Sequence, residues 1–271
     1  MKKQRLDLVL VERGLVESRA LAQRLVMAGQ VRVDGQVALK PSDKVAEQAK
    51  LTVDQGPRYV SRGGEKLEAA LQAFGLPVAG RICADVGAST GGFSDCLLQH
   101  GAGKVYAIDV GEGILDWKLR QHPQVVVMEG TNARYIERLP EPVSLVTIDA
   151  SFISLKVLLP VVKEWFSSDE EALRRGKGLG EKGDVVALIK PQFEAGRQEV
   201  RRGKGVIRDP EVHRQVLMEV LGYAVGAGWQ VRGLIASPLL GPKGNREFLV
   251  WLQPGEAAGQ ALEPLIQGVI E

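Results

Sequence analysis

The sequence predicts an α/β protein with two parts, a small N-terminal α+β domain and a larger domain built on a seven-stranded sheet. Three observations predict this. Residues 1–57 combine two helical patterns with a hairpin pattern, seven short apolar segments alternate with helical ones from residue 81 onward, and a glycine-rich turn follows the first of these segments. Because Gln55-Gly56-Pro57-Arg58 contains turn-forming residues, we expect domains at 1–57 and 62–271 and an interdomain linker at 58–61.

The composition is that of an ordinary globular protein, with 45% hydrophobic and 25% charged residues. The two cysteines, Cys83 and Cys96, give neither a disulfide framework nor a metal-ligand spacing, and the three histidines are scattered, so we expect no metal site. No apolar run approaches the roughly 18 residues that span a bilayer, and the N-terminus has no signal-peptide core. These features predict a cytoplasmic protein without a membrane partner.

The first domain reads as helix, helix and hairpin. Apolar residues from Leu6 to Leu10 predict a short helix that Gly14 stops, and Ser18 caps a second helix that ends near Gly29. In residues 31–37 apolar residues alternate around an Asp-Gly pair, which is a strong hairpin signal. A last short strand is expected over residues 50–53.

Positive charge is concentrated in this domain. Residues 1–58 hold 11 Lys/Arg against 7 Asp/Glu, whereas the whole chain has a net charge of only +2. A planar guanidinium matches phosphate oxygens, so five arginines are candidates to follow an RNA backbone: Arg5, Arg13, Arg19, Arg24 and Arg32. A solvated charged face is an equal alternative on charge alone.

The order of residues in this domain favours RNA. Arg5-Leu6-Asp7, Gly14, Ser18-Arg19, Gly29 and Asp34-Gly35 resemble the small RNA-binding module named after ribosomal protein S4. The resemblance implies a partner of folded RNA, recognised by shape and phosphate contacts.

A ligand site is expected after the first strand of the second domain. Residues 81–86 form an apolar segment, and Gly87-Ala88-Ser89-Thr90-Gly91-Gly92 leads from it into a helix through Phe93. The glycines let the backbone approach a ligand at a helix N-terminus. Because Gly-x-Gly-x-x-Gly is absent, a dinucleotide is disfavoured.

Acidic residues at strand ends strengthen this expectation. Asp109 ends the second strand, where its carboxylate can accept both ribose hydroxyls of an adenosyl ligand, and Asp85 could serve the methionine end. The Asn132 amide, after the third strand at 125–128, could pair with an adenine edge, although by itself it reads as a turn residue.

Four further strands are expected at 145–149, 185–190, 231–235 and 248–252. The pattern resembles the class I, Rossmann-like methyltransferases, which implies S-adenosylmethionine as cofactor. The residues that the resemblance assigns to cofactor binding are Asp85, Gly87, Ala88, Ser89, Gly91, Gly92, Phe93, Asp109, Asn132 and Asp149.

Four charged residues at element boundaries are candidates for catalysis: Lys66, Asp149, Lys190 and Glu247. Singly, each reads equally as a surface or strand-end polar residue. Together they resemble the Lys-Asp-Lys-Glu set of the FtsJ-related ribose 2′-O-methyltransferases. A ribose hydroxyl is a poor nucleophile, so its proton must be removed, and Lys190 is our candidate base, held by Asp149. Lys66 and Glu247 would orient the ribose.

The resemblance narrows to the TlyA family and covers nearly the whole chain. It is carried by Ser61-Arg62-Gly63-Gly64-Glu65-Lys66-Leu67, by Asp85 to Phe93, by Asp149-Ala150-Ser151-Phe152-Ile153-Ser154-Leu155 and by Lys190-Pro191-Gln192-Phe193-Glu194. It implies methylation of cytidine 2′-hydroxyls in ribosomal RNA of the large subunit and, in longer members, of the small subunit. Further RNA contacts are expected from Arg62, Arg201, Arg202 and Lys204.

One segment departs from the family pattern. Some members carry Arg-x-Trp-Val in the linker, whereas this chain has Pro57-Arg58-Tyr59-Val60. Three alternatives stay open: a methyltransferase acting on an RNA base, a catalytically silent RNA-binding protein, and a cytolysin, since TlyA-like proteins have been called haemolysins. A base methyltransferase normally lacks the four charged residues, and no long apolar helix favours a cytolysin.

Overall fold

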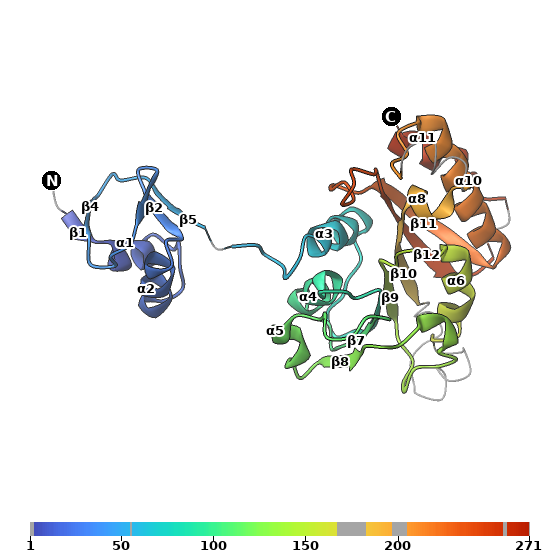
Figure 1. Cartoon of the computed structure of the whole chain (residues 1–271), viewed down its shortest axis with the longest axis horizontal. Coiled ribbons are helices and arrows are strands. Elements are labelled where there is room, and N and C mark those ends of the chain that lie inside the picture. Colours follow the sequence, from blue (N-terminus) through green and yellow to red (C-terminus); the bar gives the residue numbers. More distant parts are fainter. Residues whose placement is uncertain (1–2, 55, 167–182, 197–204, 257–258, 271) are drawn as a thin grey trace. The chain divides into compact units, whose positions relative to one another are not determined.

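The structure, a computed structural model, describes residues 3–54, 56–166, 183–196, 205–256 and 259–270. Its contacts divide the chain into two compact units, residues 1–58 and residues 59–271 (Figure 1). Tyr59 is 2% exposed and lies in the core of the second unit, where the Val60 backbone N–H also donates to Asp95 Oδ2 at 2.9 Å. These two residues therefore belong to the second unit and not to the linker predicted at 58–61.

The first unit contains the expected helices and hairpin. Its elements are β1 (Lys3–Arg5), α1 (Leu6–Glu12), α2 (Arg19–Met27), β2 (Val31–Val33), β3 (Gln36–Ala38), β4 (Lys44–Ala46) and β5 (Leu51–Val53). Ser18 caps α2 by accepting the Leu21 N–H, as its sequence position indicates. Asp34 and Gly35 both have positive φ, at 50° and 84°, which gives β2 and β3 a tight two-residue turn.

Two strands of this unit were not predicted. β1 and β4 are three residues each and pair antiparallel, with Gln4 opposite Val45. Neither segment carries a periodic pattern long enough to read, so only the tertiary fold reveals them. The unit has its own hydrophobic core, whose fully buried members are Leu6, Leu10, Ala22, Val26 and Val31.

The second unit is built on the predicted seven-stranded sheet, which the described residues form in the order β11-β12-β10-β9-β6-β7-β8. The strands are β6 (Ile82–Val86), β7 (Lys104–Ile108), β8 (Val125–Met128), β9 (Leu145–Ile148), β10 (Asp184–Ile189), β11 (Trp229–Ala236) and β12 (Phe248–Pro254). β12 runs antiparallel to both of its neighbours, and the pairs among β6 to β10 are parallel. The Rossmann-like α/β fold is thereby confirmed.

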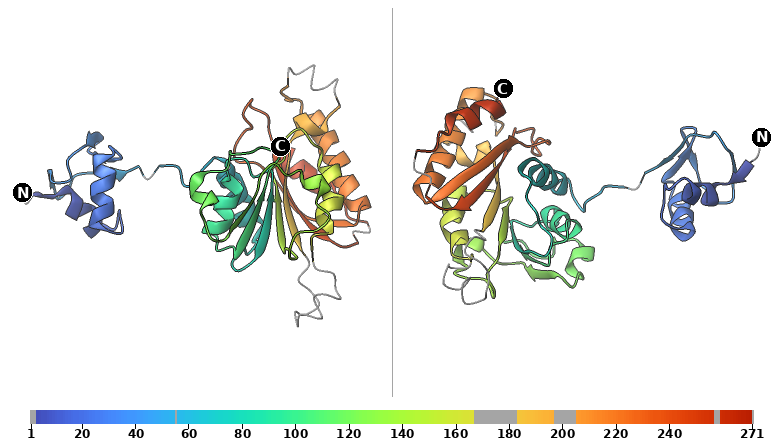
Figure 2. Two further views of the ribbon diagram at one scale, coloured as in Figure 1. Left: turned by 60° about the horizontal axis from the view of Figure 1, so that its bottom comes forward. Right: turned by 180° about the vertical axis from the view of Figure 1, so that it is seen from behind.

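Helices cover both faces of this sheet (Figures 1 and 2). The helical elements are α3 (Gly63–Phe74), α4 (Gly92–Gln99), α5 (Trp117–Arg120), the 3₁₀ turn η1 (Ala133–Tyr135), α6 (Leu155–Lys163), α8 (Pro191–Glu194), α10 (Pro210–Gly226) and α11 (Glu263–Ile270). Alternate residues of β10 face opposite cores: Val186 packs in the cluster formed with α3 and α4, and Ala187 in the one formed with α6 and α10. This explains why the strand is apolar throughout.

The strand order sets where a ligand can bind. From β6 the chain proceeds to β7 and β8 on one side, and then returns to place β9 on the other side of β6. In open α/β sheets, ligands bind beyond the carboxyl ends of the strands at this reversal. The segments that follow β6 and β9 begin at Gly87 and Asp149, which are both among the predicted site residues.

Candidate active site

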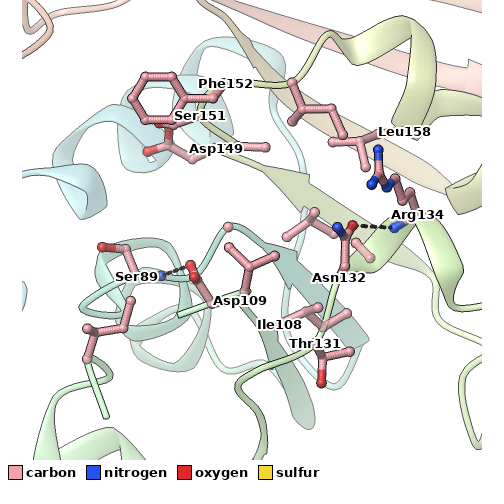
Figure 3. Close-up of a pocket in the computed structure, with 17 residues that line it drawn as sticks. Ser89, Ile108, Asp109, Thr131, Asn132, Arg134, Asp149, Ser151, Phe152 and Leu158 are labelled. Atoms are coloured by element: carbon pink, nitrogen blue, oxygen red, sulfur yellow. Dashed lines mark hydrogen bonds between the residues drawn. The ribbon is translucent and has the colours of Figure 1, made fainter. Parts of the chain in front are cut away.

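A pocket of about 500 Å³ lies at this reversal point. Five of the predicted cofactor residues line it, namely Gly87, Ser89, Asp109, Asn132 and Asp149. Figure 3 shows Ser89 and Asp109 on one side of the pocket, with Asp149, Ser151 and Phe152 facing them across it. The remaining walls are largely apolar and include Ile108, Val110, Ile114, Ala150 and Leu158. A mostly apolar cavity with a few polar groups is the usual form of a small-molecule site.

Asp109 is fixed in this pocket by two backbone amides. Its Oδ2 accepts the Ser89 N–H and its Oδ1 accepts the Gly111 N–H, both at 2.8 Å. Each carboxylate oxygen keeps a further lone pair for a ligand hydroxyl. Ser89 has φ of 51°, so the turn after β6 takes a left-handed conformation that brings its N–H to Asp109.

Sequence reasoning missed Glu129, which shapes the neighbouring wall. Its carboxylate accepts the backbone N–H groups of Gly113, Ile114 and Leu115 at 3.0 Å each and pairs with Arg120 at 2.7 Å. These donors, the Leu115 amide foremost, lower the pKa of Glu129 to about 2. Glu129 thereby fixes the segment that presents Ile114 to the pocket. Its position directly after β8 is the signal that could have indicated it.

Asn132 both caps a turn and lines the pocket. Its Oδ1 accepts the Arg134 N–H at 3.3 Å and caps η1, which is the turn role, while the residue also lines the pocket (Figure 3). A capping Oδ1 leaves the Nδ2 group as the donor that a ligand can use.

The glycines of the turn serve packing more than ligand approach. A Cβ at Gly91 would lie 2.1 Å from Leu119 Cδ1, and one at Gly92 would lie 2.3 Å from Ser61 Oγ. Gly87 approaches the Asp149 backbone, where a Cβ would come within 2.8 Å of the carbonyl oxygen. Of the three, only Gly87 lines the pocket. Gly91 and Gly92 allow close packing against α5 and α3, and their contact with the cofactor stays a prediction.

Ala88, Phe93 and Asp85 also lie outside the lining. Phe93 packs in the core between the sheet and α3. Asp85 is fully buried, and its carboxylate accepts the hydroxyls of Ser94 at 2.7 Å and Thr147 at 3.1 Å. Burial raises the pKa of Asp85 to about 7, although both hydroxyl donors oppose that shift. Its described partners tie β6 to α4 and β9, and its contact with the cofactor stays a prediction.

Replacing Asp85 by asparagine is expected to change how stability depends on pH. Since the folded-state pKa lies above the unfolded value, the Asp85 carboxylate lowers stability as pH rises from about 4 to about 7. Asparagine can accept one of the two hydroxyls with its Oδ1 and donate from its Nδ2 to the oxygen of the other, and it does not ionise. We expect Asp85→Asn to stay close to the parent near pH 4 and to exceed it by a few kcal/mol at pH 8, at about 1.4 kcal/mol per pKa unit. Thermal unfolding at both pH values checks this prediction. An equal difference in stability between variant and parent at the two pH values would contradict it.

The four predicted catalytic residues form two ion pairs. Lys190 Nζ lies 2.6 Å from Asp149 Oδ1, and Lys66 Nζ lies 2.6 Å from Glu247 Oε2. Lys66, Lys190 and Glu247 are buried, with Glu247 only 1% exposed. Lys190 and Asp149 each follow directly after a strand, β10 and β9, whose parallel pairing brings them together. None of the four is therefore a solvated surface charge.

Lys190 is further held by Ser151. Its Nζ donates to Ser151 Oγ at 3.0 Å and approaches the Asp149 carbonyl oxygen at 3.4 Å. Asp149 and Ser151 line the pocket, whereas Lys190 itself is not among the lining residues. The amine therefore lies directly behind two residues of the pocket wall.

Two residues of the segment after Lys190 were quoted in a motif but given no role. Gln192 Nε2 donates to Glu247 Oε1 at 3.4 Å. This hydrogen bond connects the segment that follows Lys190 to the ion pair of Lys66 with Glu247. Glu194 accepts the Ser154 hydroxyl at 2.6 Å and the Leu155 N–H at 2.8 Å, and so fixes the start of α6. These contacts tie the segment after β10 to Glu247 and to the loop after β9.

Phe152 stands at the pocket rim. It is 89% exposed, has φ of 63°, and its ring centroid lies 4.8 Å from that of Phe193. A bulky residue in the left-handed region is uncommon and marks a candidate functional position. The conformation presents an aromatic face to solvent beside the pocket.

The predicted RNA-binding arginines differ in their surroundings. Both terminal nitrogens of Arg13 donate hydrogen bonds to backbone carbonyl oxygens, Nη1 to Ala49 at 2.7 Å and Nη2 to Glu47 at 2.6 Å. Its guanidinium therefore stabilises the fold of the first unit. Arg24, Arg32 and Arg62 are exposed. Arg201, Arg202 and Lys204 lie outside the described residues.

Within the described part of the chain, no group of three or more His, Cys, Asp or Glu side chains could hold a metal ion. In the same residues, no helix combines the length and apolar character needed to cross a membrane.

Comparisons with known proteins agree with both units. Residues 4–51 match the S4 domain, and residues 59–254 match the FtsJ-like methyltransferase family. The chain is 45% identical over 256 residues to the "16S/23S rRNA (cytidine-2'-O)-methyltransferase TlyA" of Mycobacterium tuberculosis, covering 93% of this chain and 90% of that protein. It is 47% identical over 280 residues to the "Putative rRNA methyltransferase YqxC" of Bacillus subtilis, covering 100% and 94%.

A solved structure, "Putative hemolysin from Streptococcus thermophilus", is also similar, with 41% identity and a TM-score of 0.69 over 99% of this chain and 96% of that one. The matched domains and relatives span both units and include every residue of the two ion pairs. The chain belongs to the TlyA family, in which an S4 domain precedes an FtsJ-like methyltransferase domain.

Proposed function

We propose that the protein transfers a methyl group from S-adenosylmethionine to the 2′-hydroxyl of a cytidine in ribosomal RNA. The observation that carries the proposal is a set of two buried ion pairs: Lys190 with Asp149, which lines the pocket, and Lys66 with Glu247, which Gln192 connects to the segment after Lys190. The target class follows from the relative named a 16S/23S rRNA (cytidine-2′-O)-methyltransferase. The large subunit is the primary target and the small subunit a second one, and such substrates place the enzyme in the cytoplasm.

The pocket residues fit the proposed cofactor. Asp109 is placed to accept the ribose hydroxyls, the apolar side chains of Ile108, Val110 and Ile114 would contact the adenine, and Asn132 would reach its edge. Gly87 and Asp149 would border the methionine end. When bound, S-adenosylmethionine supplies a methyl group on a positively charged sulfur, which an oxygen nucleophile can attack.

The reaction needs the proton of the ribose hydroxyl to leave as the oxygen attacks. Lys190 is the proposed acceptor of that proton, because Asp149 holds its side chain in one orientation next to the pocket. The Lys190 ammonium must first release a proton to solvent, and the neutral amine then takes the proton of the hydroxyl. Asp149 also stabilises the ammonium that forms. Ser151 can hold the amine in place until the substrate hydroxyl arrives.

The second ion pair is proposed to orient the ribose. Lys66 lies on α3 and Glu247 directly precedes β12, and Gln192 connects this pair to the segment after Lys190. Holding the hydroxyl in line with the methyl group can supply much of the rate. The exposed face of Phe152 offers a base of the RNA a stacking surface beside this centre.

Incubation with radiolabelled S-adenosylmethionine and purified bacterial ribosomal subunits tests the proposal. We expect label in ribosomal RNA, at a cytidine whose 3′-phosphodiester bond resists alkaline cleavage because its 2′-oxygen is methylated. Label on a base would favour the alternative of a base methyltransferase. Absence of label together with leakage of liposomes would favour the cytolysin that the hemolysin name of a similar protein suggests. Absence of both would leave an RNA-binding protein.

Replacing Asp109 by alanine is expected to weaken S-adenosylmethionine binding at least tenfold. The substitution removes a charged acceptor for the ligand hydroxyls, each such hydrogen bond contributing about 1.5–3 kcal/mol, and it leaves the Ser89 and Gly111 N–H groups without their acceptor. Calorimetric titration of the full chain measures the affinity. The control is Glu112→Ala, an exposed carboxylate outside the pocket lining, which should bind as the parent does. Unchanged affinity for Asp109→Ala would remove the residue from the cofactor site.

A further inference from the structure

A fully buried carboxylate in the first unit holds two of the predicted RNA-binding arginines. Asp7 Oδ1 accepts Arg5 Nε, and Asp7 Oδ2 accepts Arg5 Nη2, Arg19 Nε and Gln23 Nε2, all four at 3.0 Å. The Asp7 side chain is 0% exposed. Hydrogen bonds from Arg5 first, and also from Gln23 and Arg19, hold the pKa of Asp7 far below its usual range against the effect of burial. The carboxylate therefore stays ionised.

The guanidinium groups of Arg5 and Arg19 each use only some of their nitrogens to bind Asp7. Arg5 Nη1 and both terminal nitrogens of Arg19 donate to no described residue, and the two side chains are 40% and 53% exposed. Two cations share one anion, so one positive charge remains uncompensated in the cluster. Arg13 differs, because both of its terminal nitrogens are used on backbone carbonyls.

These contacts would be hard to make without Asp7. Arg5 ends β1 and Arg19 begins α2, and two guanidinium groups at one point repel each other unless an anion lies between them. A guanidinium already held by its inner edge loses less side-chain entropy when its outer edge binds a phosphate. Asp7 thus lowers the cost of presenting both cations to one anion.

We infer that Asp7 joins Arg5 and Arg19 into one preorganised site for a phosphate group of structured RNA. The inference rests on the proposed function, since it assigns a place on the protein to the RNA partner. Arg5 and Arg19 make the contact, and Asp7 is a positioning residue that touches no phosphate.

Removing the Asp7 charge distinguishes positioning from simple charge. Asp7→Asn makes the protein one unit more positive, so non-specific attraction to RNA alone would tighten binding. Loss of the preorganised phosphate site would instead weaken RNA binding. Asp43→Asn is the matched control, because it removes the same charge in the same unit from an exposed side chain that makes no hydrogen bond with a described residue.

The experiment measures binding of the full chain to bacterial large ribosomal subunits at several salt concentrations. We expect Asp7→Asn to bind at least tenfold more weakly than the parent, with a smaller salt dependence, and Asp43→Asn to bind as tightly or more tightly. Thermal unfolding reports whether the variants are folded. Should Asp7→Asn not fold, Arg19→Lys keeps the charge, changes an exposed side chain and loses the fork, and it should bind several-fold more weakly.

The outcomes separate this inference from the proposed function. No binding by the parent protein at any salt concentration would overturn the RNA partner itself. Binding by the parent with equal or tighter binding by folded Asp7→Asn would overturn the positioning role alone, as would parent-like binding by Arg19→Lys where Asp7→Asn does not fold.

Discussion

Replacing Lys190 by arginine is expected to lower methyl transfer by at least about 100-fold while S-adenosylmethionine still binds. Arginine keeps the positive charge beside Asp149 but cannot give up its proton at neutral pH, so it cannot accept one from the ribose hydroxyl. General base catalysis contributes about 10²–10⁴-fold to a rate. Single-turnover transfer to ribosomal subunits and calorimetric titration of the cofactor measure the two effects separately.

Two further variants complete this test. Lys190→Ala should be as inactive as Lys190→Arg, whereas Lys156→Ala should transfer at the parental rate because Lys156 pairs with Glu219 away from the pocket lining. If Lys190→Arg retained full activity, the role of Lys190 would be electrostatic, and the base would have to be another group. If Lys190→Ala did so, the residue would have no part in the reaction.

Replacing Glu247 by alanine is expected to destabilise the second unit by about 3–5 kcal/mol and to abolish activity. The substitution leaves the Lys66 ammonium, whose side chain is only 11% exposed, without its carboxylate, and an uncompensated buried charge is costly. For a domain of this size such a loss lowers the midpoint of thermal unfolding by on the order of 10 °C. Thermal unfolding and single-turnover transfer check the two parts of the prediction.

The double variant Lys66→Met with Glu247→Leu separates stability from function. Replacing both charges by apolar groups of similar size removes the uncompensated charge, so stability should return close to that of the parent. Methyl transfer should remain absent, because the pair that orients the ribose is gone. The exposed ion pair of Lys156 with Glu219 provides the control. Glu219→Ala should lower the free energy of unfolding by no more than about 1 kcal/mol. An active double variant would show that the buried pair has a structural role only.

Several site residues were predictable from sequence because strand ends are local signals. A run of apolar residues that stops at an acid or a lysine marks the carboxyl end of a buried strand, and Asp109, Asp149 and Lys190 were all found in this way. The catalytic roles proposed for the paired acids and lysines come from the family resemblance. Glu129 follows the same rule but was overlooked, since its partners are backbone amides that no side-chain pattern records.

The sequence by itself determined the order of the elements, since strand and helix periodicity, caps and turn residues are properties of neighbouring residues. Only the tertiary structure decided what each polar residue contacts. It joins Lys66 to Glu247 across 181 residues, buries Asp85 against two hydroxyl groups, and makes Gly91 and Gly92 packing positions. The physical reason is that burial and pairing depend on which elements pack together, and one residue type fits a ligand contact and a core contact equally well until that packing is known.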